Sequence, residues 1–398
     1  MNVRRYNLAM SRYTAKFALL QGFYWITSCL VYAYAERFLT AFGFSVQHVG
    51  FVMATANGIA LLMQPLFADL ADRPNGPSLR AEICAGAALS VLLALLLLLW
   101  QNALPVIAVL FCALSTVTLT VQPMLNSVGF YYVDRGDPID YSLARGIASA
   151  VFAGYCYCMG FFAERNGSLL LWTYLLANAG MFLMALVFAP KKQPVRVSEK
   201  PTGTAALLKK HPYLVFFLLG TVLTFAAHNF INAYMLSIVA HIGKGTHEMS
   251  TAISLAAILE IPAMCGFSLL QKRFRLERML IFSFVAFLVK HLLMLLPLYF
   301  HAGIWAVYLS QSLQLCGYAL FIPASSFFVN DRMDSTDKVK GQMLLTESIT
   351  ISCILGQLFG GYCIAWVGVP QTMLFGCILS GVGLLLLRQG IQRSRGKA

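Results

Sequence analysis

Residues 80–101, RAEICAGAALSVLLALLLLLWQ, form an apolar stretch whose only charges lie in its first three positions. A bilayer core about 30 Å thick is crossed by about 20 apolar residues in a helix. The same pattern recurs along the whole chain, since 59% of its 398 residues are hydrophobic and 11% are charged. This composition excludes a water-soluble domain and predicts an all-α integral membrane protein. We predict twelve transmembrane helices, at 15–40, 46–70, 80–101, 104–131, 141–163, 168–190, 212–240, 249–271, 278–299, 302–330, 339–366 and 370–388.

Positive charge is concentrated in alternate connections between these spans. If the N-terminus is cytoplasmic, the inner segments hold every basic residue except Arg37, Arg165, Lys244 and Lys290. The positive-inside rule therefore predicts that both termini are cytoplasmic. The net charge of +13 then reflects this topology and contact with anionic membrane lipid. It does not indicate nucleic-acid binding, because the basic residues are not gathered on one surface.

The chain divides at one long polar connection. We predict an N-terminal six-helix bundle at 1–190, a cytoplasmic linker at 191–211 and a C-terminal six-helix bundle at 212–398. Prolines recur at the same helix of each half, since Pro65 matches Pro262 and Pro123 matches Pro323. Equal helix counts predict two parallel repeats related by an axis along the membrane normal, with a substrate site between them near the midplane.

The connection after the second span reads ADLADRPNG at 68–76. It resembles the Gly-x-Leu-Ala-Asp-Arg-x-Gly signature of the major facilitator superfamily, with Ala68 where that family usually has glycine. The resemblance implies a transporter of two six-helix halves. It also implies a cytoplasmic gate made by Asp69, Asp72 and Arg73, in which a carboxylate holds a helix end or a basic partner until the charges rearrange.

A closer resemblance is to the lactose permease-like group of oligosaccharide and nucleoside proton symporters. Three short stretches carry it: QPLF at 64–67, YSLARG at 141–146 and EIP at 260–262. The resemblance implies proton-coupled uptake. The chain departs from the group at Asn126, where the lactose permease has a glutamate that binds substrate, and at Gln314, where the group often has histidine.

Three charged residues inside spans are the candidates for proton coupling. A carboxylate at the bilayer centre costs about 2.5–3.5 kcal/mol, so Glu260 is expected to face the bundle interior or a cavity, where it can change protonation state. Lys290 lies at comparable depth, which leaves a permanent ion pair as the alternative. Glu347 is the competing proton carrier, or else an inner-end carboxylate that pairs with a nearby lysine.

Polar side chains at helical spacing predict a cavity. Amides, hydroxyls and aromatic rings with few charges suit a neutral hydroxylated solute such as a sugar or nucleoside. The alternative is polar packing between helices, and for Arg145 a contact with lipid phosphates. The predicted substrate contacts are Trp25, Asn126, Arg145, His228, Asn232 and Gln314.

We therefore predict a secondary transporter that couples proton entry to uptake of a small polar solute. The ten cysteines all lie in predicted spans, and no phosphate-binding loop, zinc spacing or nucleophile motif is present. The sequence thus favours a protein that is not an enzyme and needs no cofactor or metal. We expect a monomer in a bacterial inner membrane. The alternatives are a drug or metabolite exporter of the same superfamily and a receptor or scaffold that does not transport.

Overall fold

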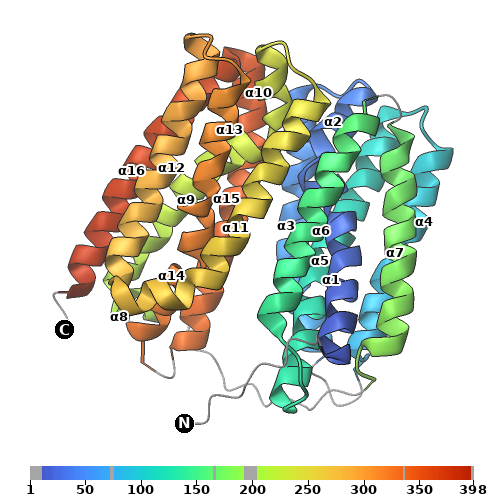
Figure 1. The fold of residues 1–398 in the computed structure, drawn as a ribbon, viewed down its shortest axis with the longest axis horizontal. Coiled ribbons are helices and arrows are strands. Elements are labelled where there is room, and N and C mark those ends of the chain that lie inside the picture. Colours follow the sequence, from blue (N-terminus) through green and yellow to red (C-terminus); the bar gives the residue numbers. More distant parts are fainter. Residues whose placement is uncertain (1–10, 72–75, 165–166, 192–203, 335–336, 396–398) are drawn as a thin grey trace.

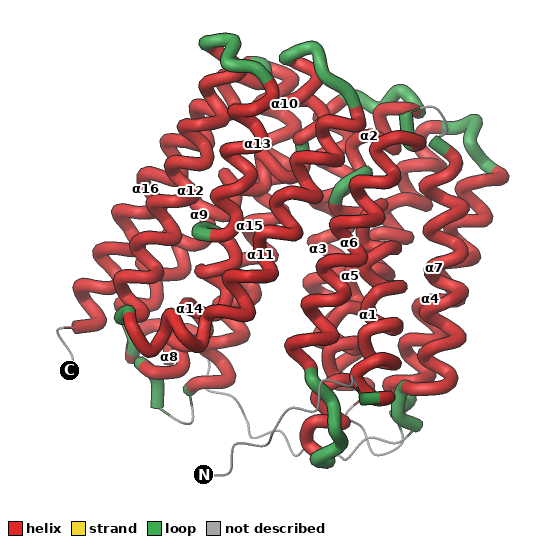
Figure 2. The backbone as a smooth tube through the Cα atoms, viewed as in Figure 1, coloured by secondary structure: helices red, strands yellow, loops and turns green. Residues whose placement is uncertain are grey.

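A computed structural model describes residues 11–71, 76–164, 167–191, 204–334 and 337–395, apart from the side chains of residues 68, 69, 71 and 395. All regular elements in these residues are helices, and they run side by side in two groups (Figures 1 and 2). The first group, or first half, comprises α1 (Arg12–Tyr32), α2 (Ala35–Ala41), α3 (Val46–Ala71), α4 (Leu79–Leu99), α5 (Leu104–Asp134), α6 (Tyr141–Phe162) and α7 (Ser168–Phe188). The second half comprises α9 (Pro212–Ala233), α10 (Met235–His241), α11 (Thr246–Arg273), α12 (Leu276–Tyr299), α13 (Ile304–Ser312), η1 (Leu313–Leu315), α14 (Tyr318–Asp331), α15 (Lys338–Val367) and α16 (Val369–Arg395), with the short α8 (Thr204–Lys210) before them.

Ten helices in the described residues are long and apolar enough to cross a membrane, and α1 with α2 makes an eleventh if this bent pair is one span. The predicted fifth span, α6, has 22 residues but is outside this set. Arg145 and the tyrosines of α6 make it less apolar than its neighbours. The all-helical prediction agrees with the structure, whereas the count of twelve spans is not established by length and composition.

The first predicted span of each half is broken, although we predicted a continuous helix in both. The break between α1 and α2 bends the chain by 52° at Tyr34, and α9 gives way to α10 at Tyr234. The Tyr34 hydroxyl contacts the Cys156 carbonyl oxygen and the Ser250 hydroxyl, both at 2.7 Å. The Tyr234 hydroxyl donates to the carbonyl oxygen of Gln357. In both halves, the break thus lies beside a contact with a distant part of the chain. The spacing of apolar residues in the sequence does not predict such contacts.

The predicted span at 302–330 is also interrupted, by the 3₁₀ turn η1 between α13 and α14. At the end of this turn Gly317 has φ −82° and ψ −91°, and its carbonyl oxygen accepts a hydrogen bond of 2.7 Å from the Ser283 hydroxyl of α12. A 3₁₀ turn inside a long helix often marks a functional site. Gln314 lies in this turn and therefore not in a regular α-helix.

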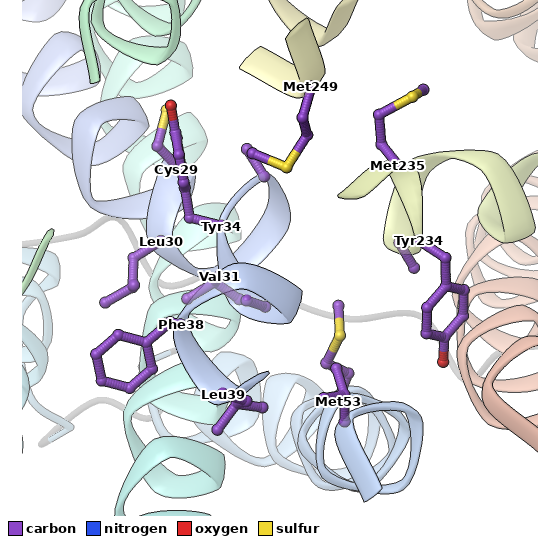
Figure 3. Packing of buried hydrophobic residues seen from close by; sticks show 14 of the residues in the cluster. Cys29, Leu30, Val31, Tyr34, Phe38, Leu39, Met53, Tyr234, Met235 and Met249 are labelled. Carbon is purple, nitrogen blue, oxygen red and sulfur yellow. The ribbon is translucent and has the colours of Figure 1, made fainter. Parts of the chain in front are cut away.

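Among the described residues, the two halves share one hydrophobic core, which lies at one end. We call this the closed end; it carries α2 and α10, and the opposite, terminal end carries the first residues of α1 and the last of α16 (Figure 1). The shared core contains residues of both halves. Figure 3 shows Val31 and Tyr34 of the first half in one cluster with Tyr234, Met235 and Met249 of the second.

The other two cores each belong to one half. One, from Phe17 to Ala189, lies within the first half, and the other, from Leu207 to Ile391, lies within the second. The ribbons of the halves converge at the closed end and stand apart toward the terminal end (Figure 1). Within the described residues, apolar packing therefore joins the halves at the closed end, whereas the other two cores each stay within one half.

Two helix pairs join the halves, α3 with α15 and α6 with α11. Glycines allow close approach in both pairs. A Cβ atom on Gly160 would lie 2.7 Å from the Ser250 Cβ, and one on Gly50 would overlap the Tyr234 hydroxyl and the Gln357 carbonyl oxygen. Small residues at helix contacts of this kind are typical of membrane bundles.

Gly50→Ala is expected to destabilise the closed end, because the added methyl group meets backbone that has no room to move. Overpacking of this kind costs about 1–3 kcal/mol, and the melting temperature of the purified protein should fall. Gly58→Ala, on the same helix, is the matched control, because nothing lies within 4 Å of its Cβ position. Equal melting temperatures for the two variants would contradict the close packing at Gly50.

Candidate functional site

A chain of hydrogen bonds joins three predicted site residues inside the second half. Lys290 Nζ donates to Gln314 Oε1 at 2.7 Å, and Gln314 Nε2 donates to Glu260 Oε1 at 2.8 Å. Lys290 is 1% exposed and Gln314 is 5% exposed. The structure therefore brings Glu260 and Lys290 together through an amide, and it does not form the direct ion pair that was the alternative.

Local backbone features position each of the three residues in this chain of hydrogen bonds. Glu260 lies two residues before Pro262, which cannot donate a backbone hydrogen bond within α11. Gln314 lies in η1, and Lys290 lies on α12, whose backbone carbonyl oxygen at this residue accepts from Ser310 at 2.8 Å. Three separate elements thus converge on one amide, whose oxygen can accept from an ammonium while its nitrogen donates to a carboxylate.

Arg145 and Trp25 face this chain from the first half. The Arg145 guanidinium carbon lies 5.4 Å from the centre of the Trp25 ring, a distance within the range of cation–π attraction. The charge of Arg145 also acts on Glu260 across the halves. Arg145 Nη1 and Trp25 Nε1 are buried without a hydrogen-bond partner in the described residues. These two donors are therefore candidate contacts for a solute.

Asn126 is engaged by a residue that the sequence analysis did not select. Gln21 Nε2 donates to Asn126 Oδ1 at 3.3 Å, while Gln21 Oε1 is buried without a partner among the described residues. Gln21 precedes Trp25 by four residues on α1, so the two side chains share a helix face. The free acceptor at this site thus belongs to Gln21, and Asn126 orients it. The helical spacing of polar residues on α1 is the signal that identifies Gln21.

His228 and Asn232 form a pair on α9. Asn232 Nδ2 lies 2.8 Å from His228 Nε2, and the Tyr318 ring stacks on the imidazole with centroids 6.0 Å apart. With Nε2 accepting, the neutral imidazole carries its proton on Nδ1, and that atom is buried without a partner in the described part of the chain. His228 therefore offers a third free donor.

The remaining predicted site residues are Glu347, Asp69, Asp72 and Arg73. Glu347, on α15, makes no hydrogen bond or ion pair with any residue that the structure describes, so neither its coupling role nor its predicted lysine pairing gains support. Asp72 and Arg73 lie outside the described residues, as does the side chain of Asp69. The cytoplasmic gate stays a prediction.

One group in the described residues has the geometry for a metal ion, His211 with Asp334 and Asp337. The Lys210 ammonium already lies there, 2.7 Å from an Asp334 oxygen and 2.6 Å from an Asp337 oxygen. These bonds raise the pKa of Lys210 to about 12, and the lysine lowers the pKa of Asp334. The cation at this position is therefore a lysine, and the group ties the end of α8 to the start of α15.

These residues together form the candidate site for a polar solute and a coupled proton. The site combines one carboxylate, two cations and three unpaired donors, drawn from both halves. Such a constellation between repeats is where membrane transporters bind substrate and coupling ions.

Comparison with known proteins identifies the family. The MFS_1 like family matches residues 17–375. The chain belongs to this family. The predicted superfamily is confirmed, and the chain is a multi-pass membrane protein of a transporter family with a small-molecule substrate. No curated protein sequence matches the chain at a significant level.

Solved transporters share the fold of this family member. A mutant of nucleoside transporter NupG has a TM-score of 0.79 and 16% identity over 96% of this chain and 98% of its own. Nucleoside transporter NupG itself has a TM-score of 0.77 and 16% identity over 96% and 99%. A POT family transporter in complex with 5-aminolevulinic acid has a TM-score of 0.65 and 12% identity over 96% and 95%.

Gln314→Leu is expected to destabilise the protein, because it leaves the Lys290 ammonium and the Glu260 carboxylate without the amide between them. A buried charged group that loses its partner costs about 1–3 kcal/mol or more. Gln311→Leu is the matched control, since Gln311 is 1% exposed and its amide nitrogen is already unpaired within the described residues. The check is thermal unfolding of both variants, and an equal loss would show that the bridge contributes nothing.

Proposed function

We propose that this protein is a proton-coupled symporter that takes up a small polar solute by alternating access. The observation that carries the proposal is the Lys290–Gln314–Glu260 chain, facing Arg145 across the two halves. An ionisable residue inside a membrane bundle is expensive, and a carboxylate there commonly marks a proton pathway.

Glu260 carries the proton in this proposal. In its ionised form it attracts Lys290 in its own half and Arg145 in the other. Protonation removes both attractions, so the electrostatic tie between the halves depends on whether the proton is bound. A solute that occupies the free donors of Arg145 and Trp25 compensates for this loss. Proton and solute then favour the same state, and each raises the affinity for the other.

The solute is a sugar or a nucleoside. The unpaired polar atoms are Gln21 Oε1, Trp25 Nε1, Arg145 Nη1 and His228 Nδ1. Together they can bind hydroxyl and carbonyl groups, and the Trp25 and Tyr318 rings can contact a planar ring. The fold shared with nucleoside transporter NupG supports testing nucleosides first.

Alternating access in this proposal is a rocking of the halves about the central site. Both termini lie in the cytoplasm and twelve spans cross the membrane, with α6 among them, so the closed end faces outward. The separate cores at the terminal end let each half move as a body there, while the shared core at the closed end must part when the site opens outward.

Glu260→Gln is expected to abolish gradient-driven accumulation while solute exchange persists, because the variant keeps the hydrogen bond but cannot change charge. For one proton per solute, a gradient of one pH unit sustains about a tenfold accumulation, since one unit equals about 1.4 kcal/mol. The measurement is uptake into proteoliposomes of a labelled panel of sugars, nucleosides and aromatic acids.

Glu347→Gln is the control for this experiment, and it is expected to accumulate solute as the wild type does. Wild-type accumulation in Glu260→Gln, together with loss of accumulation in Glu347→Gln, would contradict the proposal and identify Glu347 as the proton carrier. Solute extrusion from cells by the wild type would instead favour the exporter.

A further inference from the structure

The connection between α11 and α12, at the terminal end, carries a dense group of basic residues. All of them are exposed. We call this group the basic corner; it comprises Lys272, Arg273, Arg275 and Arg278. Like charges this close together repel one another, so the group is stable only where anions lie nearby.

The protein itself supplies little negative charge to the basic corner. Glu277 is the acidic residue of this segment, and its buried carboxylate is bonded to Arg332 Nη2 at 2.7 Å. Arg275 Nε lies 4.0 Å from the other oxygen of Glu277, which is beyond hydrogen-bond range. The other three members make no side-chain hydrogen bond or ion pair with any residue that the structure describes. The basic corner therefore keeps an excess of positive charge.

Two other connections at the terminal end pair their basic residues with acidic ones. Between α5 and α6, Arg135 Nε lies 3.7 Å from an Asp137 oxygen. Before α15, Lys210 contacts Asp334 and Asp337. The positive-inside rule concerns all of these connections, and it does not require that the cations of any one of them lack acidic partners. The excess charge at the basic corner thus calls for a partner of its own.

The surroundings of the basic corner are apolar and face outward. The 28 residues of α11 span about 42 Å, whereas a bilayer core is about 30 Å thick, so the ends of this helix reach the headgroup region. Among the ten candidate spans, α11 has the smallest buried share, 28%. Exposed apolar side chains flank the cations on both helices and between them, at Leu269, Phe274 and Phe282. Cations beside such side chains suit an anion that carries acyl chains.

We propose that the basic corner binds the headgroup of an anionic phospholipid, with Phe274 and the exposed apolar side chains of α11 and α12 against its acyl chains. The guanidinium groups can bind the phosphate through paired hydrogen bonds, and the lysine adds a point charge. Binding here places one lipid at the end of the helix that carries Glu260 and packs against α6 of the other half. The site requires that the terminal end meets a membrane surface, whichever compartment it faces.

The test measures the binding of single lipids to the purified full chain by native mass spectrometry. The probes are phosphatidylglycerol and phosphatidylcholine with identical acyl chains, and inorganic phosphate as a competitor without chains. The wild type should bind phosphatidylglycerol at least about tenfold more tightly than phosphatidylcholine, because each basic residue near an anionic headgroup contributes a severalfold gain. Phosphate at the concentration of the lipid should not compete. Displacement of the lipid by phosphate would assign the basic corner to a soluble anion and overturn the proposal.

Removing the four charges together should reduce this preference to about twofold or less. The variant combines Lys272→Gln, Arg273→Gln, Arg275→Gln and Arg278→Gln. The matched control loses the same charge at scattered positions of α8, α15 and α16, and should keep the wild-type preference. It combines Lys209→Gln, Lys338→Gln, Lys340→Gln and Arg388→Gln.

Two double variants serve if the fourfold variant does not fold. They are Lys272→Gln with Arg273→Gln, and Arg275→Gln with Arg278→Gln, and each should lose part of the preference. Wild-type preference in the variants of the basic corner, or an equal loss in the scattered control, would overturn the proposal, because the lipid would then respond to net charge alone. Since neither solute nor proton gradient is present, the result does not depend on the proposed coupling at Glu260.

Discussion

Lys290 is 1% exposed in a long apolar helix, and its ammonium can be accommodated only if polar groups reach it inside the bundle. Gln314 meets this constraint on one side and Glu260 completes the charge balance through the amide. The interruption of the helix at η1 and the fixed position of Gly317 serve this arrangement. Arg145 then brings a second cation to the same carboxylate from the other half. The groups that pair with the buried lysine thus include a carboxylate. The net charge of the site changes when that carboxylate binds a proton.

The closed end is also held by contacts to which both halves contribute. The shared core, the close contacts at Gly50 and Gly160 and the Glu36 carboxylate all lie where the halves meet, and each involves residues of both halves. Apolar packing supplies most of the contact, but it does not respond to protons or to charge. The carboxylate adds hydrogen bonds from the backbone of the opposite half to this apolar contact.

The sequence was sufficient for the class of protein and for most helices, because spans of about 20 apolar residues and a matched pair of halves leave few other folds. It also placed Glu260 and Lys290 at comparable depth. It did not foresee the breaks at Tyr34, Tyr234 and η1, since these accompany contacts between residues more than a hundred positions apart or between neighbouring helices. For the same reason it did not predict the amide that joins Glu260 to Lys290, and it left Gln21 and Glu36, whose partners lie on other helices, outside the predicted site.

The pH dependence of solute affinity tests the central claim most directly. The affinity of the purified protein for its transported solute would be measured by calorimetry between about pH 5.5 and about pH 8.5, for the wild type and for Glu260→Gln. If one proton at Glu260 is linked to binding, log Kd of the wild type should rise with pH at a slope approaching about one per unit in the upper range, and the variant should lose this slope. An equal slope in both proteins, or none in the wild type, would contradict the account.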